Sequence, residues 1–257
     1  MSDVLSARGI SKSFGGLKAV QEFSLALGPG SLQGLIGPNG AGKTTAFNLL
    51  TGVYEPDGGA ISLAGKDILG KKPSEIAAIG MARTFQNIRL FGNLSVLDNV
   101  KIACHLRVKH TMMGAVVRTM MHRREEAEIE ARSHELLKIF DLDDRVNEEA
   151  RNLAYGDQRR LEIARAIATD PKVLLLDEPA AGMNPQEKIA LKGLIRKVRD
   201  QFKLTVLLIE HDMSVVMDLC EKITVLDHGQ TIAVGTPQEV QNNPKVIEAY
   251  LGVEAVE

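Results

Sequence analysis

The sequence LQGLIGPNGAGKTT, residues 32–45, decides the fold of this protein. Its first five residues follow a Gly-rich turn and are expected to form a strand. Residues 43–50 are expected to form a helix. Residues 37–45, which follow the strand and open the helix, fit the pattern G-x(4)-G-K-[ST] of a phosphate-binding loop (P-loop). A strand before the loop and a helix after it are the context that this motif requires, so the sequence predicts a P-loop nucleotide site.

The residue types in this loop follow from phosphate chemistry. Glycines let the backbone wrap closely around phosphate oxygens, and the helix N-terminus adds partial positive charge. Lys43 places a cation on the β- and γ-phosphates, and the Thr44 hydroxyl is a ligand for Mg²⁺. We therefore expect ATP and Mg²⁺ as cofactors, with ATP hydrolysis as the reaction. The residues expected to bind the nucleotide here are Gly37, Pro38, Asn39, Gly40, Ala41, Gly42, Lys43, Thr44 and Thr45.

A second part of the site is expected after the apolar run of residues 173–176. Such a continuous run is typical of a strand that is buried on both faces, and it ends in Asp177 and Glu178. Ligands of parallel sheets bind at the carboxyl ends of strands. We expect Asp177 to hold Mg²⁺ and Glu178 to orient or deprotonate the attacking water.

The rest of the chain alternates between strand and helix patterns. Strands are expected at 4–10, 20–27, 60–63, 205–209, 223–226 and 231–234, and helices at 186–202, 214–220 and through much of 97–142. Such alternation predicts an α/β fold with a largely parallel sheet and helices on both faces.

Composition excludes several classes of function. The net charge is −2 and Trp is absent, so neither a basic surface nor a stacking platform points to nucleic acid as a partner. The two cysteines, Cys104 and Cys220, are far apart, which argues for buried thiols in a reducing compartment. The N-terminus lacks a signal core, and no apolar run reaches the roughly 20 residues of a membrane helix. We expect a cytosolic chain whose membrane role depends on a partner.

From Val4 to Gly252 the sequence resembles the ATP-binding cassette (ABC) ATPases. Lys43, Gln86, the segment 153–158, the pair Asp177-Glu178 and His211 occur in the order and rough spacing of that family. The resemblance implies a single ABC ATPase domain over residues 1–252, followed by a tail at 253–257. It also implies a mostly parallel core sheet, an N-terminal antiparallel β region and an inserted helical subdomain at about 95–168.

The resemblance assigns further site residues. Gln86 would lie in the Q-loop, where it contacts Mg²⁺ and senses the membrane partner. His211 would contact the γ-phosphate, completing a catalytic set with Lys43 and Glu178. Phe14 would lie under the adenine ring, and residues 181–184 would form the D-loop at a dimer interface.

The signature segment departs from the family's usual Leu-Ser-Gly-Gly-Gln. Here Leu153 is followed by Ala154, Tyr155, Gly156 and Asp157, which the resemblance places against the nucleotide. Gly156 keeps the close backbone approach. Ala154 removes a hydroxyl and Asp157 puts a carboxylate where an amide is usual, so we expect weaker electrostatics beside the phosphates.

Four segments look like the ATP-binding subunits of bacterial branched-chain amino-acid importers, namely residues 83–100, 152–168, 177–185 and 207–220. This resemblance implies uptake of leucine, isoleucine and valine. It also implies two transmembrane permease subunits, a second ATPase subunit (the same chain or a paralogue) and, indirectly, a periplasmic amino-acid-binding protein. The chain would then lie on the cytoplasmic face of the inner membrane.

Two alternatives stay open at this stage. The chain could serve another cargo, such as lipid or lipopolysaccharide export, or it could be a soluble ABC protein of DNA repair or translation. A single cassette without sustained heptads or a basic stripe disfavours the soluble class. Residues 106–124 mix methionines with arginines, which fits either a helix near a membrane or a partner, or one packed on its own domain.

Overall fold

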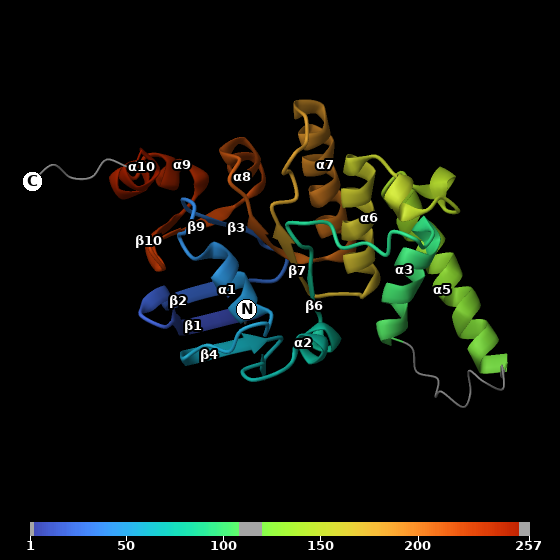
Figure 1. Ribbon diagram of the computed structural model, residues 1–257, viewed down its shortest axis with the longest axis horizontal. Helices are drawn as coiled ribbons and strands as arrows, with labels where there is room; N and C mark the ends of the chain where they lie inside the picture. Colours follow the sequence, from blue (N-terminus) through green and yellow to red (C-terminus); the bar gives the residue numbers. More distant parts are fainter. Residues whose placement is uncertain (1–2, 108–119, 252–257) are drawn as a thin grey trace, which may run out of the picture. The chain divides into compact units, whose positions relative to one another are not determined.

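Figure 1 shows the computed structural model, which describes residues 3–107 and 120–251. The chain divides into two compact units. One unit joins the segment that ends at Arg83 to the segment that begins at Lys172, and the other is Thr84–Pro171. The sequence prediction for the helical part was about 95–168.

The first unit contains an antiparallel sheet of four strands in the order β2-β1-β4-β5. β1 pairs with both β2 and β4 in antiparallel register, as expected for the N-terminal region. The strands are β1 (Leu5–Phe14), β2 (Leu17–Leu27), β4 (Gly58–Leu63) and β5 (Lys66–Asp67).

The same unit contains a six-stranded sheet in the order β10-β9-β3-β8-β7-β6. Neighbours from β9 to β6 are parallel, and only β10 is antiparallel, so the largely parallel sheet is confirmed. Its strands are β3 (Leu32–Ile36), β6 (Met81–Arg83), β7 (Val173–Asp177), β8 (Thr205–Ile209), β9 (Lys222–Asp227) and β10 (Gln230–Gly235). The helices of this unit are α1 (Lys43–Leu50), α2 (Pro73–Ile79), α7 (Pro185–Phe202), α8 (Met213–Leu219), α9 (Pro237–Gln241) and α10 (Pro244–Leu251).

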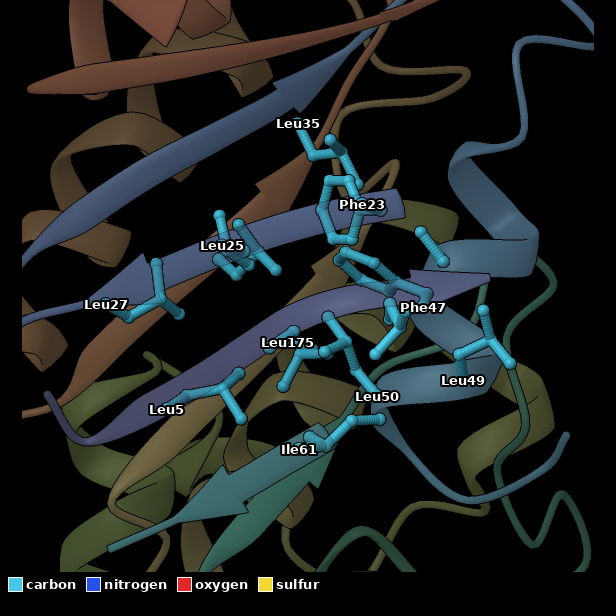
Figure 2. Packing of buried hydrophobic residues seen from close by; sticks show 14 of the residues in the cluster. Leu5, Phe23, Leu25, Leu27, Leu35, Phe47, Leu49, Leu50, Ile61 and Leu175 are labelled. Carbon is cyan, nitrogen blue, oxygen red and sulfur yellow. The ribbon is translucent and has the colours of Figure 1, made fainter. Parts of the chain in front are cut away.

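The main core of this unit lies around α1. Phe47 and Leu50 of α1 join Phe23 of the antiparallel sheet and Leu35 and Leu175 of the six-stranded sheet in one buried cluster, shown in Figure 2. This helix is therefore held from both sheets by apolar burial, which fixes the loop in front of it.

The other face of the six-stranded sheet carries α8. A Cβ atom on Gly34 would lie 3.1 Å from Cys220 Sγ and 3.2 Å from Val216 of this helix, so little space remains there. Because Leu35, the next residue of β3, faces the α1 cluster, the alternation of the strand places helices on both faces of the sheet.

The second unit is helical in its described part. Its longer helices are α3 (Val96–Cys104), α5 (Met120–Ile139) and α6 (Tyr155–Ala168), and both α5 and α6 pack against α3. The basic, methionine-rich stretch singled out in the sequence, residues 106–124, lies mostly outside the described residues.

Both cysteines are free and buried. Burial raises the pKa of the Cys220 thiol to about 12, and it also raises the pKa of Cys104. Within residues 3–107 and 120–251, no helix has the length and apolarity needed to span a membrane.

Candidate nucleotide-binding site

Several of the predicted site residues follow the carboxyl ends of three neighbouring parallel strands in the six-stranded sheet. The P-loop follows β3, Glu178 follows β7, and His211 comes two residues after β8, which lies between them. In register, Ile209 is paired with both Leu35 and Asp177, so the three strands end at the same level. The parallel arrangement therefore brings together parts of the sequence that are more than 100 residues apart.

Two glycines of the P-loop are required by the backbone around them. A Cβ on Gly37 would lie 2.0 Å from the Leu226 carbonyl oxygen. Gly42 has a φ of 98°, and its Cβ would lie 2.4 Å from the Ala19 carbonyl oxygen. Gly42 also begins α1 without a capping side chain, so the first N–H groups of α1 have no partner from that residue. This is the helix terminus that favours phosphate.

Lys43 is buried, and its ammonium group is hydrogen-bonded to backbone carbonyl groups of the P-loop. Nζ donates to the carbonyl oxygens of Gly37 at 2.7 Å and Pro38 at 2.8 Å. Burial lowers the pKa of Lys43, while the nearby carboxylates of Glu178 and Asp177 act in the opposite direction. The lysine predicted to meet the phosphates is thus already inside the loop and in the field of both predicted carboxylates.

Asp177, the predicted Mg²⁺ ligand, is held in an ion pair with Arg83. Arg83 Nη2 lies 2.8 Å from Asp177 Oδ2, and its Nη1 donates to Asn48 Oδ1 at 2.6 Å. The pair is buried, with side-chain exposures of 10% and 5%. Arg83 therefore connects the end of β6, the end of β7 and helix α1, and it fixes where the Asp177 carboxylate points.

Glu178 and His211 lie close together. His211 Nδ1 is 3.6 Å from Glu178 Oε2, and the histidine side chain is 60% exposed. Glu178 also has a φ of 47°, a left-handed conformation that is uncommon for a residue with a side chain. Strained backbone of this kind is frequent at functional sites.

The carboxylate of Glu210 is hydrogen-bonded to the backbone next to this pair. Its carboxylate is completely buried and accepts hydrogen bonds from the backbone N–H of Ala180 at 2.7 Å and of His211 at 3.1 Å. Burial raises its pKa, whereas these backbone donors lower it. Glu210 thus joins the segment after Glu178 to the loop that carries His211.

The donor set suits magnesium. Thr44 and Asp177 offer a hydroxyl and a carboxylate, which are the hard oxygen ligands that Mg²⁺ prefers. The described residues contain no group of three or more His, Cys, Asp or Glu side chains that would form a metal cage of their own.

Phe14, the residue expected to lie under adenine, is exposed at the end of β1. Its ring meets Tyr54 edge-on, with 5.2 Å between the centroids, and Lys12 Nζ lies 5.9 Å from the Phe14 centroid. Phe14 is 43% exposed and Tyr54 38% exposed, so these rings are not core residues. An exposed aromatic pair is a suitable surface for a base to stack on.

Gln86 and the signature segment belong to the second unit. Ala154 is the N-cap of α6, and Tyr155, Gly156 and Asp157 form the first turn of this helix. Asp157 Oδ2 lies 3.0 Å from Arg145 Nη1, and its Oδ1 lies 3.8 Å from Arg160 Nη1. The carboxylate that departs from the family pattern is therefore paired with two arginines.

Sequence reasoning found Lys43 and Asp177 but missed other buried charged residues. Arg83 and Glu210 were not singled out, nor were Arg159 and Glu162 of α6. Position was the available signal for the first two, since Arg83 lies three residues before Gln86 and Glu210 directly precedes His211.

Comparisons with known proteins agree with this architecture. The family described as "ABC transporter" matches residues 20–181, and the one described as "Branched-chain amino acid ATP-binding cassette transporter" matches residues 230–256. The second match covers β10, α9 and α10. Lys245, Glu248 and Ala249 of α10 line the same pocket as P-loop residues 38–41.

Three relatives cover nearly all of this chain. The high-affinity branched-chain amino acid transport ATP-binding protein LivG of Escherichia coli is 47% identical over 97% of this chain and 98% of its own. BraF of Pseudomonas aeruginosa, with the same description, is 45% identical over the same shares. The lipopolysaccharide export system ATP-binding protein LptB of Acidithiobacillus ferridurans is 34% identical over 98% of each chain.

Solved structures lead to the same family. An ATP-binding cassette of an ABC transporter in its ADP conformation is similar with a TM-score of 0.84 and 30% identity, covering 98% of this chain and all of the other. A nucleotide-free cassette has the same TM-score and coverage at 29% identity. Since the ABC transporter model matches residues 20–181 and relatives of 45–47% identity span nearly the whole chain, this chain belongs to the ABC transporter family as an ATP-binding cassette of its branched-chain amino acid group.

Proposed function

We propose that this chain is the motor subunit of an ABC importer, and that it couples the binding and hydrolysis of MgATP to the uptake of branched-chain amino acids. The observation that carries the proposal is that the P-loop with Lys43, the loop with His211 and the residue Glu178 follow the carboxyl ends of the neighbouring strands β3, β8 and β7. The names of LivG and BraF supply the cargo class.

Binding falls to the P-loop in this proposal. The backbone N–H groups of residues 37–45 and the N-terminus of α1 receive phosphate oxygens, and Lys43 turns from the loop carbonyls to the β- and γ-phosphates. Thr44, Asp177 and Gln86 would hold Mg²⁺, which neutralises charge on the phosphates when it is bound. The Phe14 ring stacks on adenine.

Hydrolysis falls to Glu178 and His211. Glu178 accepts a proton from the attacking water or orients it, a role that needs a carboxylate at the end of β7. His211 would stabilise the γ-phosphate, and its distance of 3.6 Å from Glu178 allows the two side chains to act on the same group. Glu210 keeps His211 in place through the backbone.

We further infer that the cassette works as a dimer, in which residues 154–157 of one subunit cover the nucleotide on the P-loop of the other. The second subunit is either the same chain or a paralogue. Two transmembrane permease subunits would place the dimer at the cytoplasmic face of the inner membrane, and a periplasmic binding protein would deliver the amino acid. An ATPase subunit does not touch the cargo, so these partners determine it.

A second candidate cargo has one specific observation in its favour. LptB, which is named for lipopolysaccharide export, is 34% identical over nearly the whole chain. The higher identity to LivG and the match to the branched-chain family at residues 230–256 favour amino acids. Purification with the membrane subunits, followed by uptake of labelled leucine into vesicles, distinguishes the two, since an export motor would give no ATP-dependent leucine uptake.

The roles of Lys43 and Glu178 are tested by a pair of variants. Lys43→Ala should weaken ATP binding and abolish turnover, because the lysine acts on the ground-state phosphates. Glu178→Gln should keep ATP binding but lose turnover by roughly 10²–10⁴-fold, as expected for a general base. ATP affinity and the steady-state ATPase rate are measured for both. A Glu178→Gln protein with near-normal turnover would refute the assignment.

A further inference from the structure

A completely buried ion pair lies on α6, one turn after the signature segment. Arg159 is 0% exposed and Glu162 is 2% exposed, and Arg159 Nη1 lies 2.7 Å from Glu162 Oε2. Burying two charges is costly unless further hydrogen bonds satisfy the remaining donors and acceptors. The partners of this pair therefore indicate what it is there to hold.

Most of these partners belong to the backbone around Gln86. Arg159 donates from Nη1 to the carbonyl oxygen of Phe85 at 2.7 Å and from Nη2 to that of Gln86 at 2.8 Å. Glu162 Oε1 accepts from the N–H groups of Phe85 and Arg89, both at 3.3 Å. The ion pair thus binds residues 85–89 through two carbonyl and two amide groups, which fixes the backbone on either side of the Gln86 side chain.

The remaining contact leads to the signature segment. Arg159 Nη2 donates to the hydroxyl oxygen of Tyr155 at 3.1 Å, and the guanidinium carbon lies 5.8 Å from the centroid of the Tyr155 ring. Tyr155 is 46% exposed, so packing around its side chain does not by itself fix the position of the hydroxyl group. A single side chain therefore contacts both segments of this unit that the family resemblance assigns to the nucleotide.

We propose that Arg159 is a positioning residue that makes the Gln86 loop and the signature segment move as one body. The inference rests on the proposed function, in which Gln86 acts on one nucleotide and Tyr155 to Asp157 cover the other. Only a guanidinium has the planar fork of donors that can reach two carbonyls, a carboxylate and a phenol at once. The Glu162 carboxylate keeps this fork oriented.

The main test is Arg159→Lys. Lysine keeps the positive charge, but it lacks the planar fork of donors that holds both segments. Hydrogen exchange should become faster at the amides of Phe85 and Arg89, since these amides lose their oriented acceptor. The KM for ATP should change little, because the P-loop is untouched. The kcat should fall roughly 10–100-fold, the loss expected when a catalytic element is displaced by about 1 Å.

Two further variants separate positioning from folding. Arg159→Met with Glu162→Met removes both buried charges together, which proteins often tolerate, and it should reproduce the low kcat in a protein that melts cooperatively. Tyr155→Phe retains the ring and removes only the hydroxyl. It should leave exchange at residues 85–89 unchanged and yet weaken ATP-dependent dimerisation.

Gln86→Ala and Gly156→Asp are measured beside these variants. If both lower turnover while Arg159→Lys keeps wild-type kcat and exchange, the positioning role is refuted and the proposed function stands. A low kcat in Arg159→Lys without faster exchange at residues 85–89 also refutes it. If neither Gln86→Ala nor Gly156→Asp affects turnover, the proposed site fails and this inference fails with it.

Discussion

Asp157 holds its negative charge between two arginines at the start of α6. The sequence suggested that this carboxylate weakens the electrostatics beside the phosphates, since relatives usually carry an amide there. In the structure Arg145 lies 3.0 Å away and Arg160 lies 3.8 Å away. A carboxylate in the first turn also interacts favourably with the positive end of the helix dipole. The net charge near the signature segment is therefore set by the three residues together.

This cluster predicts that two substitutions change ATP-dependent dimerisation in opposite directions. Asp157→Asn leaves Arg145 and Arg160 uncompensated, so the segment becomes more positive and ATP-dependent dimerisation should tighten. Arg145→Met leaves the carboxylate with one fewer cation, so dimerisation should weaken. Both are measured by size-exclusion chromatography of the Glu178→Gln background with ATP. Equal dimerisation in the two variants would show that the cluster does not face the nucleotide.

Single residues also show where the sequence was a poor guide. Lys43, Asp177 and His211 belong to motifs, which can be recognised from residue types and their spacing in the sequence alone. Arg159, Glu162 and Glu210 are buried charged residues. The sequence around a charged residue on a helix or after a strand does not show whether its side chain is buried or exposed. Their roles follow from partners 30 to 77 residues away in sequence. Only the folded backbone makes those partners visible.

At the scale of elements, the apolar runs were informative. Residues 173–176 were expected as a strand buried on both faces, and β7 is Val173–Asp177 with every residue buried. The short elements were not expected: β6 has three residues, and α2 has seven. Periodicity cannot identify elements of this length, because they span less than two helical turns or a few strand residues. Yet β6 ends in Arg83, so a short element carries the residue that orients Asp177.

Helix α8 offers a prediction for stability. Asp212 caps it by accepting from the Ser214 N–H at 2.9 Å, and it also pairs with Lys188. The hydrogen bond from Lys188, followed by that from the Ser214 hydroxyl, lowers the pKa of Asp212 to about 2. Asp212→Ala should reduce the free energy of unfolding by about 1 kcal/mol, the usual contribution of a helix cap.

The pH dependence of this effect has a defined sign. A carboxyl with a depressed pKa stabilises the fold above its ordinary value of 3.8, and that contribution is lost as the pH falls towards about 2. Urea denaturation of wild type and Asp212→Ala should therefore differ most near neutral pH and converge in acid. Asp200→Ala is the control, since Asp200 is exposed beside Arg199 and should have little effect at any pH. A difference that grows in acid would contradict the capping role.

At the scale of the molecule, the division into two units follows the division of the chemistry. The unit with the six-stranded sheet holds the P-loop, Asp177, Glu178 and His211, whereas the helical unit holds Gln86 and the signature segment. In the proposed dimer the signature segment acts on a nucleotide bound by the other subunit. One chain would then contribute half of each of two sites, and activity would depend on which halves meet.

Dimers that combine two different variants test whether each site is made of halves from two subunits. Lys43→Ala homodimers have two defective sites, because neither P-loop binds phosphate, and Gly156→Asp homodimers have two because neither signature segment can approach. A heterodimer of the two variants has one doubly defective site and one site made only of wild-type halves. Mixing the inactive proteins should therefore restore ATP hydrolysis, at a level well below wild type because only part of the mixture forms heterodimers.

Heterodimers are verified by pull-down with two different tags, so that a lack of rescue cannot be attributed to a lack of assembly. The Lys43→Ala variant mixed with Glu178→Gln is the matched control. If the P-loop and Glu178 belong to the same half-site, its heterodimers contain one defect in each site and should stay inactive. Rescue in the first mixture and none in the second would assign the signature segment to the opposite subunit. Heterodimers of Lys43→Ala with Gly156→Asp that bind ATP but do not hydrolyse it would reject the composite site, provided that a dimer with a single wild-type site is active.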